Sequence, residues 1–224
     1  EDACREALPG CLPHGIRLEV RTPHIASPDV KVDDKNRQIK MYFHGLEGLS
    51  HQVTRMALSG DAINFVAQPQ ILAKPYLRIF EYENETYAIA MPSQIYRYNE
   101  SAQIFGEGPL LFERDMRRCA VIVRNSKLNV FWTRVGDVLE SILFSTIDLN
   151  REWERWTNEG DFEVLRPERD WEGASEPLLP SQRSSGYGPL NQLRDPAAFE
   201  DGDFAYLFYA AAGESGIGVV QIDW

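Results

Sequence analysis

Apolar and polar residues alternate along much of this chain, in short runs separated by Gly, Asn, Asp and Ser. The first group of such runs covers residues 29–32, 39–43, 52–58 and 63–65, with polar turns between them. Period-two alternation with many β-branched and aromatic residues is typical of β-strands. The pattern therefore predicts a four-stranded antiparallel unit, closed by Ile71 and Leu72.

The same order of strands and turns recurs along the chain. The closing segment 99–105 lies about forty residues after its counterpart 59–65, which is the length of one propeller blade. The repeats are expected at residues 27–72, 75–112, 117–166 and 193–223, and the last stops after three strands. We therefore predict an all-β chain in which residues 1–224 form a single β-propeller domain.

Two segments lie outside the repeats. Residues 166–191 form an aperiodic insertion rich in Pro, Ser and Gly, and long loops of this kind usually carry function. Gly15–Val20 is a lone alternating strand. It either supplies the missing fourth strand of the last repeat and closes the ring, or is the tail of an incomplete fifth blade.

The formal net charge of −11 argues against a nucleic-acid partner, because phosphate binding requires clustered Lys and Arg. No apolar run approaches the length of a membrane span, and the first residues carry no signal-peptide pattern. We expect a soluble chain with neither a nucleic-acid nor a membrane partner. The compartment and the oligomeric state are left open.

The chain contains three cysteines, at positions 4, 11 and 119. They form no Cys-x-x-Cys pair, so we expect no structural zinc site. Cys4 and Cys11 could pair in an oxidising compartment, whereas Cys119 lies in a strand-like run and is expected as a buried thiol. No residue pattern demands a metal or an organic cofactor.

Antiparallel meandering brings the start of each first strand and the hairpin between the second and third strands to the same face of a propeller. This face is expected to collect several charged residues and a histidine: Asp29, His44, Arg78, Arg118, Arg134, Asp195 and Glu214, with Glu172 added by the insertion. Asp29 and Asp195 are expected at equivalent places in two repeats, each beside a proline. The alternative is structural: such residues cap strands or pair between blades, and Trp132 fits the core between blades.

Two motifs resemble a known group of proteins. Arg194-Asp195-Pro196-Ala197, followed by Tyr206-Leu207-Phe208-Tyr209, resembles a blade opening of the five-bladed propeller glycosidases. This group contains glycoside hydrolase family 43 and the related families 32, 62, 68 and 117. Ser27-Pro28-Asp29-Val30 with Met41-Tyr42-Phe43-His44-Gly45 is similar to the same opening in another blade. The resemblance runs from about His24 to the end of the chain.

The resemblance implies a sugar-binding funnel at the centre of the disc. Asp29 would be the general base, Glu172 the general acid and Asp195 a third carboxylate, since glycoside hydrolysis needs one protonated and one ionised carboxyl. The expected substrate-binding residues are His44, Arg78, Arg118, Trp132, Arg134 and Glu214. Two features depart from the family pattern. Arg117-Arg118 stands where those enzymes often carry an acidic residue, and Glu172-Gly173 is not followed by the proline that commonly follows Glu-Gly in the family.

Two classes of function remain open at this stage. The first is a glycoside hydrolase-like enzyme that acts on an oligosaccharide or a glycosyl end group without a cofactor. The second is a non-catalytic propeller that binds a carbohydrate or another partner, or an incomplete fragment of such an enzyme. The carboxylates at the disc centre are the feature that would separate them.

Overall fold

The computed structural model describes residues 22–183, 186 and 188–224. Regular structure in this part is almost entirely β, with fifteen strands and two short 3-10 turns, η1 (Trp153–Arg155) and η2 (Asp170–Glu172). The prediction of an all-β fold is confirmed. The strand expected at Gly15–Val20, together with Cys4 and Cys11, lies outside the described residues.

The strands form four antiparallel sheets, each following the order of the chain, which we call blades I to IV. Blade I contains β1 (Ile25–Asp33), β2 (Gln38–Gly48), β3 (His51–Ser59) and β4 (Val66–Ala67). Blade II contains β5 (Arg78–Tyr82), β6 (Glu85–Ala90), β7 (Gln94–Asn99) and β8 (Ile104–Leu110). Blade III contains β9 (Met116–Arg124), β10 (Lys127–Arg134), β11 (Ile142–Asp148) and β12 (Asn158–Leu165). Blade IV has three strands, β13 (Arg194–Asp201), β14 (Phe204–Ala211) and β15 (Gly216–Ile222).

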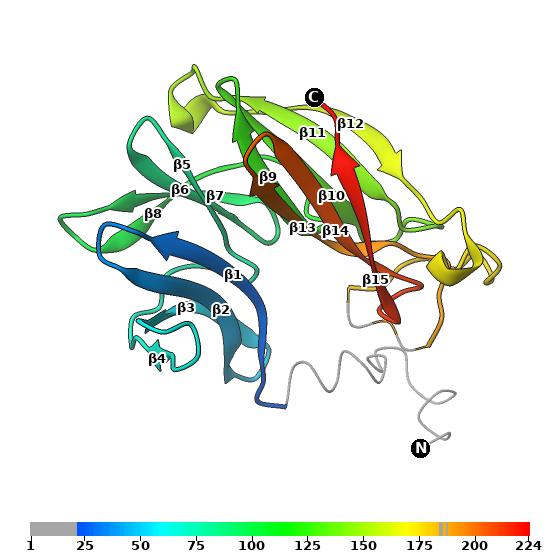
Figure 1. Cartoon of the computed structure of the whole chain (residues 1–224), viewed down its shortest axis with the longest axis horizontal. Coiled ribbons are helices and arrows are strands. Elements are labelled where there is room, and N and C mark those ends of the chain that lie inside the picture. The colour runs from blue at the N-terminus through cyan, green and yellow to red at the C-terminus, as the bar shows by residue number, and fades with distance from the viewer. Residues whose placement is uncertain (1–21, 184–185, 187) are drawn as a thin grey trace.

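The blades follow one another around an arc in chain order (Figure 1). Their first strands lie innermost, since β5 packs on β9 and β9 packs on β13. Blades I and IV are the two ends of the arc, and no described strand lies between them (Figure 1). The described strands thus form a propeller arrangement of four blades.

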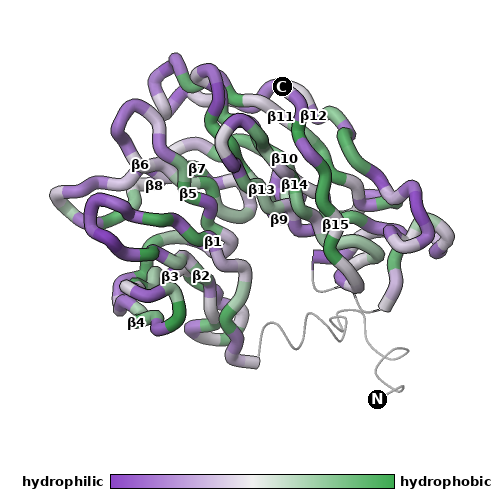
Figure 2. Tube along the Cα trace, in the orientation of Figure 1, coloured by the Kyte–Doolittle hydropathy of each residue, from purple (hydrophilic) through white to green (hydrophobic). Residues whose placement is uncertain are grey.

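The hydrophobic core lies between the blades. Three buried clusters fill the three junctions: one around Tyr42 and Ile79 between blades I and II, one around Ile89 and Trp132 between II and III, and one around Leu207 between III and IV. Hydrophobic stretches accordingly run along the strands, and hydrophilic ones gather at the hairpins (Figure 2). Burial of apolar surface, about 25 cal/mol per Å², is what holds neighbouring blades together.

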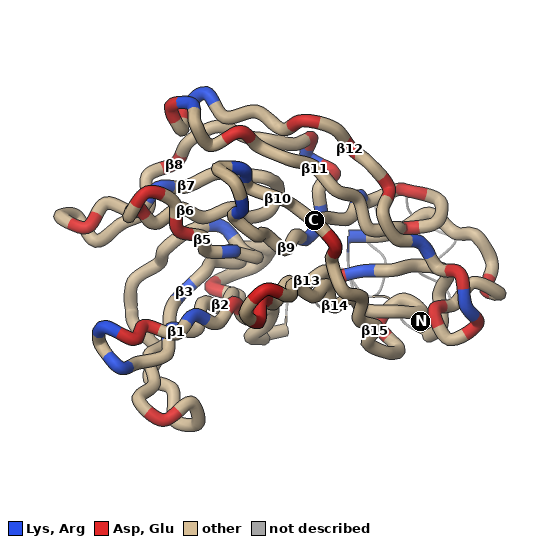
Figure 3. Tube along the Cα trace, turned by 45° about the horizontal axis from the view of Figure 1, so that its top comes forward, with Lys and Arg blue, Asp and Glu red and all other residues tan. Residues whose placement is uncertain are grey.

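Charged residues of both signs are interspersed along the described chain rather than separated into regions of one sign (Figure 3). Within residues 22–224, apart from the three positions not described, no helix has the length and apolar character needed to cross a membrane. Cys119 is a free, buried thiol in this part of the chain, and burial raises its pKa to about 12.

Candidate functional site at the propeller axis

The first strands of blades I and IV are interrupted by β-bulges. The pairing register shifts between Ala26 and Asp29 in β1, and between Arg194 and Ala197 in β13. In each bulge the residue before the proline, Ser27 or Asp195, has a left-handed backbone with φ of 52°. Bulges of this type re-aim side chains and are frequent beside functional sites.

The bulges also show which residues of the two blades correspond. Ser27 and Asp195 occupy the same place, directly before Pro28 and Pro196. Asp29, paired with Tyr42, corresponds in register to Ala197, paired with Phe208. The prediction that Asp29 and Asp195 are equivalent is therefore wrong, because the aspartates lie on opposite sides of the proline.

Tyr76, at the start of blade II, has a left-handed backbone with φ of 61°. A bulky residue adopts this conformation only where its surroundings impose it, and such positions cluster at functional sites. The Tyr76 hydroxyl accepts a hydrogen bond from Arg118 Nη2 at 3.1 Å, and its ring lies 4.2 Å from that of His44. The Arg118 guanidinium also lies 4.6 Å from the Tyr76 ring centroid. Sequence reasoning did not select Tyr76, because no local pattern reveals a left-handed tyrosine.

Six polar side chains from all four blades meet near the axis, and we call them the axial cluster: Asp29, His44, Tyr76, Arg78, Arg118 and Asp195. Its members link successive blades. The Ile79 backbone N–H in blade II donates to Asp29 Oδ2 at 2.8 Å, and Arg118 of blade III forms an ion pair with Asp195 of blade IV. The structure thus gathers two of the three carboxylates nominated for catalysis, and gives both a structural partner.

Among the described residues, the hydrogen bonds that Arg78 donates to backbone groups all go to carbonyls. Its Nε bonds to the Cys119 carbonyl of blade III at 3.1 Å, and its Nη1 to the carbonyls of Ser27 at 3.3 Å and Leu77 at 3.0 Å. Within the described chain its guanidinium has no carboxylate in an ion pair. Arg78 therefore brings a positive charge to the axis that hydrogen-bond acceptors hold in place but do not neutralise.

His44 is 1% exposed, and both of its ring nitrogens are buried without a hydrogen-bond partner among the described residues. Burial, followed by the positive charges of Arg118, His24 and Arg78, lowers its pKa to about 4. His44 is therefore neutral at pH 7, with one ring nitrogen able to donate and the other able to accept. Buried polar groups are normally paired, so an unpaired histidine beside the axis requires an explanation.

A second charged network lies at the junction of blades III and IV. Glu140 is fully buried and pairs with Arg117 at 3.1 Å and Arg194 at 3.0 Å. Glu214, a predicted substrate-binding residue, pairs with Arg117 at 3.5 Å and Arg194 at 3.4 Å. Burial raises the pKa of Glu140, while the two guanidinium groups oppose that shift. This network joins the two blades through charge.

Two further predicted residues lie within blade III. Arg134 pairs with Asp161 at 2.8 Å and Asp115 at 3.4 Å, with its guanidinium 4.9 Å from the Trp132 ring centroid. Trp132 is buried in the junction with blade II, and its indole N–H donates to Ser145 Oγ at 3.0 Å. The burial of Trp132 leaves no surface for contact with a ligand.

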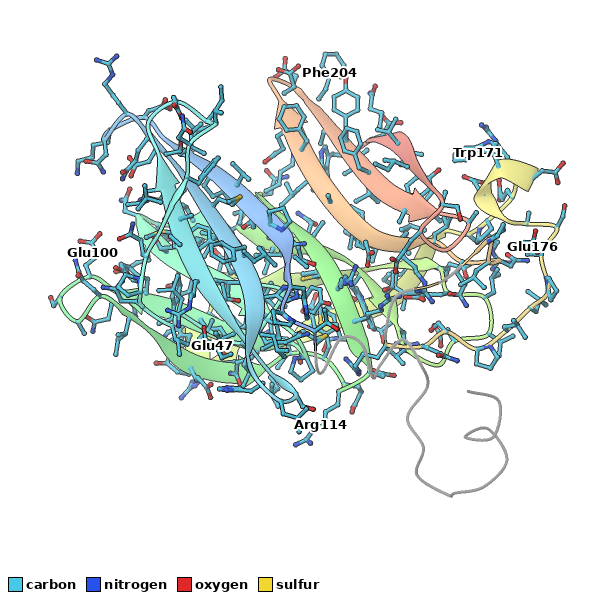
Figure 4. All side chains as sticks on the ribbon, turned by 90° about the horizontal axis from the view of Figure 1, so that it is seen from below. Glu47, Glu100, Arg114, Trp171, Glu176 and Phe204 are labelled. Carbon is cyan, nitrogen blue, oxygen red and sulfur yellow. The ribbon has the colours of Figure 1, made fainter. Side chains whose placement is uncertain are left out.

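Glu172 is part of η2. This turn, marked by Trp171 in Figure 4, lies at the outer rim of blades III and IV, away from the axis. Glu172 Oε2 accepts the backbone N–H groups of Glu168 at 2.9 Å and Arg169 at 3.0 Å, and its Oε1 accepts the Tyr209 hydroxyl at 2.8 Å. In the described structure its hydrogen bonds are with the preceding turn and with Tyr209 and Ala212 of blade IV, and none is with a member of the axial cluster. Glu172 is thus held outside the cluster that contains Asp29 and Asp195.

Among the residues that the structure describes, no group of three or more His, Cys, Asp and Glu side chains is placed to hold a metal ion. The axis itself presents hydrogen-bonding groups, charges and one neutral imidazole.

No protein-family model matches the chain. An uncharacterized protein of Acanthamoeba polyphaga mimivirus, R118, is 32% identical over 215 residues, which covers 86% of this chain. The chain spans 60% of the length of that relative.

Solved structures show a clearer likeness of fold. A thermostable family-43 glycoside hydrolase matches with a TM-score of 0.61 and 11% identity, over 89% of this chain and 72% of that one. The α-L-arabinanase of Cellvibrio cellulosa in complex with arabinohexaose matches with a TM-score of 0.60 and 8% identity, over 90% and 74% of the two chains. The expected resemblance to the propeller glycosidases is confirmed at the level of the fold.

Proposed function

We propose that the protein binds a carbohydrate at the axial cluster and does not hydrolyse it. The observation that carries this proposal is that each carboxylate nominated for catalysis has at least one oxygen held by a group of the protein. Asp29 holds a backbone N–H of blade II, Asp195 pairs with Arg118, and Glu172 accepts three hydrogen bonds at the rim. Hydrolysis requires one carboxyl that delivers a proton and a second across the bond from it.

Binding is supported by the groups that remain available. Arg78 carries a charge without a carboxylate partner in the described chain, and a guanidinium presents a planar fork of donors to hydroxyl or carboxylate oxygens. His44 is buried beside Tyr76 and keeps two unpartnered ring nitrogens next to the cluster rather than at its surface. A cluster rich in donors with few free acids suits recognition of a hydroxylated ring.

Calorimetric titration with arabinohexaose, xylotriose and mannobiose tests this proposal. We expect at least one of them to bind, and Arg78→Gln to weaken that binding about tenfold, the effect of losing roughly 1.4 kcal/mol of charge-assisted hydrogen bonding. Arg78→Lys retains the charge and should recover part of the affinity. Arg151→Gln, which alters an exposed arginine on another edge, is the matched control. Binding that is absent for all three sugars, or unchanged in Arg78→Gln, would overturn the proposal.

The alternative is hydrolysis, and the shared fold with a family-43 enzyme is the observation that favours it. In that case Asp29 would be the base, Glu172 the acid and Asp195 the third carboxylate. Release of nitrophenol from aryl glycosides measures it directly. Turnover that disappears in both Asp29→Asn and Asp195→Asn would replace the binding proposal with an enzymatic one.

We also propose that the propeller is of the five-bladed type, with a further blade covering the outer faces of blades I and IV. Both faces carry exposed apolar side chains: Ile25, Val30 and Val32 on blade I, and Phe199, Phe204, Phe208, Ile217 and Val219 on blade IV. At every junction between described blades the corresponding faces are buried. A fifth blade would enclose the axial cluster on its open side.

A further inference from the structure

A cavity of about 430 Å³ lies at the outer rim, where β12 of blade III, β15 of blade IV and the turn η2 meet. Its volume falls within the roughly 300–1,000 Å³ of small-ligand sites. We refer to it as the rim pocket; the residues that matter below are Glu168, Arg169, Trp171, Glu172 and Tyr209. It is separate from the axial cluster, because none of its lining residues belongs to that cluster.

The floor of the rim pocket is rigidly built. The Tyr209 ring lies directly over Gly218 of β15, where an added Cβ would stand 2.3 Å from a ring carbon. The Tyr209 hydroxyl donates to Glu172, whose other oxygen receives two backbone N–H groups of the preceding turn. The Ala212 N–H also donates to the Glu172 carbonyl at 3.1 Å. The floor and the turn are therefore held in one arrangement before any ligand arrives, which lowers the entropic cost of binding.

The turn after Glu172 is fixed by its backbone. Gly173 has φ of +86°, and a Cβ at this position would lie 2.2 Å from the Leu190 carbonyl oxygen. Asn191 Nδ2 donates to the carbonyls of Ala174 at 3.1 Å and Glu176 at 3.0 Å. The segment expected as an irregular insertion is thus folded back on itself by these contacts, and Glu172 ties it to Tyr209 and Ala212 of blade IV. Trp171 and Glu176 mark the segment in Figure 4.

The wall of the pocket combines an aromatic face with polar groups. Trp171 lines it and is 49% exposed, although an indole of this size is usually covered. Arg169 and Glu168 are exposed beside it, and Arg169 forms no ion pair within the described part of the chain. An indole face covers the C–H side of a sugar ring, while carboxylate and guanidinium groups pair with its hydroxyls.

We propose that the rim pocket is a second carbohydrate site, which binds one sugar residue or a disaccharide unit through Trp171, Arg169 and Glu168. The exposed carboxylates of Glu163 and Glu168 in the wall match the charges of Arg166 and Arg169, so the wall has no excess of positive charge for a strongly anionic ligand such as a nucleotide phosphate. This site is independent of the axial cluster, so either site can exist without the other. In this site Glu172 and Tyr209 act as positioning residues, because their polar atoms are used within the protein.

The test is titration of the whole protein with the methyl glycosides of xylose, arabinose, mannose and glucose, followed by tryptophan fluorescence and backbone amide NMR shifts. We expect at least one glycoside to shift the amides of residues 166–172 and 218–220. Trp171→Ala should weaken this binding about tenfold, the effect of losing one aromatic contact. Trp224→Ala is the matched control, because Trp224 is 47% exposed and does not line the pocket.

Two further variants keep the result interpretable. Arg169→Gln should weaken binding without changing the fold, because Arg169 is exposed and unpaired by any described carboxylate. Arg78→Gln, in the axial cluster, should leave binding at the rim pocket unchanged, so failure of one site does not imply failure of the other. The proposal is overturned if no methyl glycoside shifts these amides, or if Trp171→Ala and Trp224→Ala give the same affinity.

Discussion

The two faces of blade IV are made by the same strands but meet different surroundings. On one face of β14, Leu207 and Tyr209 are buried against blade III. On the other, Phe204 and Phe208 are exposed beside Ile217 and Val219 of β15. A strand that is apolar on both faces is typical of a sheet covered on both sides, whereas a half-solvated sheet alternates apolar with polar residues. The exposed face therefore has the composition of a blade junction without a described partner.

The largest effect is expected inside the covered junction. Glu140→Ala removes the fully buried carboxylate that Arg117 and Arg194 share, although both keep their contacts with the partly exposed Glu214. Breaking a buried ion pair in this way costs about 3–5 kcal/mol. Urea denaturation measures the loss in free energy of unfolding. Glu140→Gln keeps hydrogen-bonding capacity and should be less destabilising, which covers the case in which Glu140→Ala does not fold.

The control for this prediction is an exposed glutamate in the same blade. Glu200 is exposed on β13 of the same blade, and Glu200→Ala should change stability by less than about 0.5 kcal/mol. A cost for Glu140→Ala as small as that of Glu200→Ala would mean that charge does not hold blades III and IV together.

The next largest effect is the pH dependence of stability that is caused by His44, at the junction between blades I and II. Burial and the nearby cations hold the pKa of His44 at about 4, below its ordinary value of 6.5. Between these values the unfolded chain binds more protons than the folded one, so stability rises with pH and is lost as the pH falls from about 6.5 toward 4. The full loss is on the order of 3 kcal/mol.

His44→Phe retains a ring against Tyr76 but removes the titrating group, so the slope of stability between pH 4 and 6.5 should flatten. His51→Phe, at an exposed position in the same blade, serves as the control. Thermal unfolding followed across this pH range gives both slopes. Equal slopes in wild type and His44→Phe would show that His44 is not buried as a neutral ring.

The third prediction tests whether the exposed face of blade IV is covered in the same way as the face that packs on blade III. If a fifth blade covers blade IV, Phe208→Ala should cost about 2 kcal/mol or more in free energy of unfolding, approaching the 2–5 kcal/mol expected for Leu207→Ala. An exposed phenylalanine on a bare face should cost less than about 0.5 kcal/mol. Denaturation of the two variants side by side decides this, and a small cost for Phe208→Ala contradicts the five-bladed proposal.

Sequence patterns predicted the architecture well because strand alternation is a local property. The all-β fold and its propeller arrangement follow from repeated runs such as 39–43 and 52–58, which the structure shows in β2 and β3. The spacing of repeats then placed Asp29, Arg78, Arg118 and Asp195 near one axis, where the structure also has them.

The site was less predictable because its geometry depends on single backbone angles and on contacts between blades. The bulge at Asp195 shifts the register by an amount that the Asp-Pro motif does not reveal, and Tyr76 adopts a left-handed backbone without Gly or Asn. Glu172 was predicted as the general acid from a short motif alone. Its hydrogen bond with Tyr209 joins residues 37 positions apart. Such long-range pairing is invisible to local patterns.

The smallest expected effect is a difference in stability cost between two ion pairs, one joining two blades and one more exposed within a single blade. Arg118 and Asp195 join blades III and IV with side chains only 14% and 24% exposed, so Asp195→Asn should cost about 1 kcal/mol, near the upper end for partly solvated pairs. Arg97 and Glu85 form a pair within blade II that is 40% and 44% exposed, and Glu85→Gln should cost no more than about 0.5 kcal/mol.

Salt should increase the difference between the two costs, because screening acts mainly on exposed charges. Measured at low and high ionic strength, the Asp195→Asn cost should persist and the Glu85→Gln cost should vanish. The reverse order would place the Arg118–Asp195 contact in open solvent, and the axial cluster would then lose its role in joining the blades.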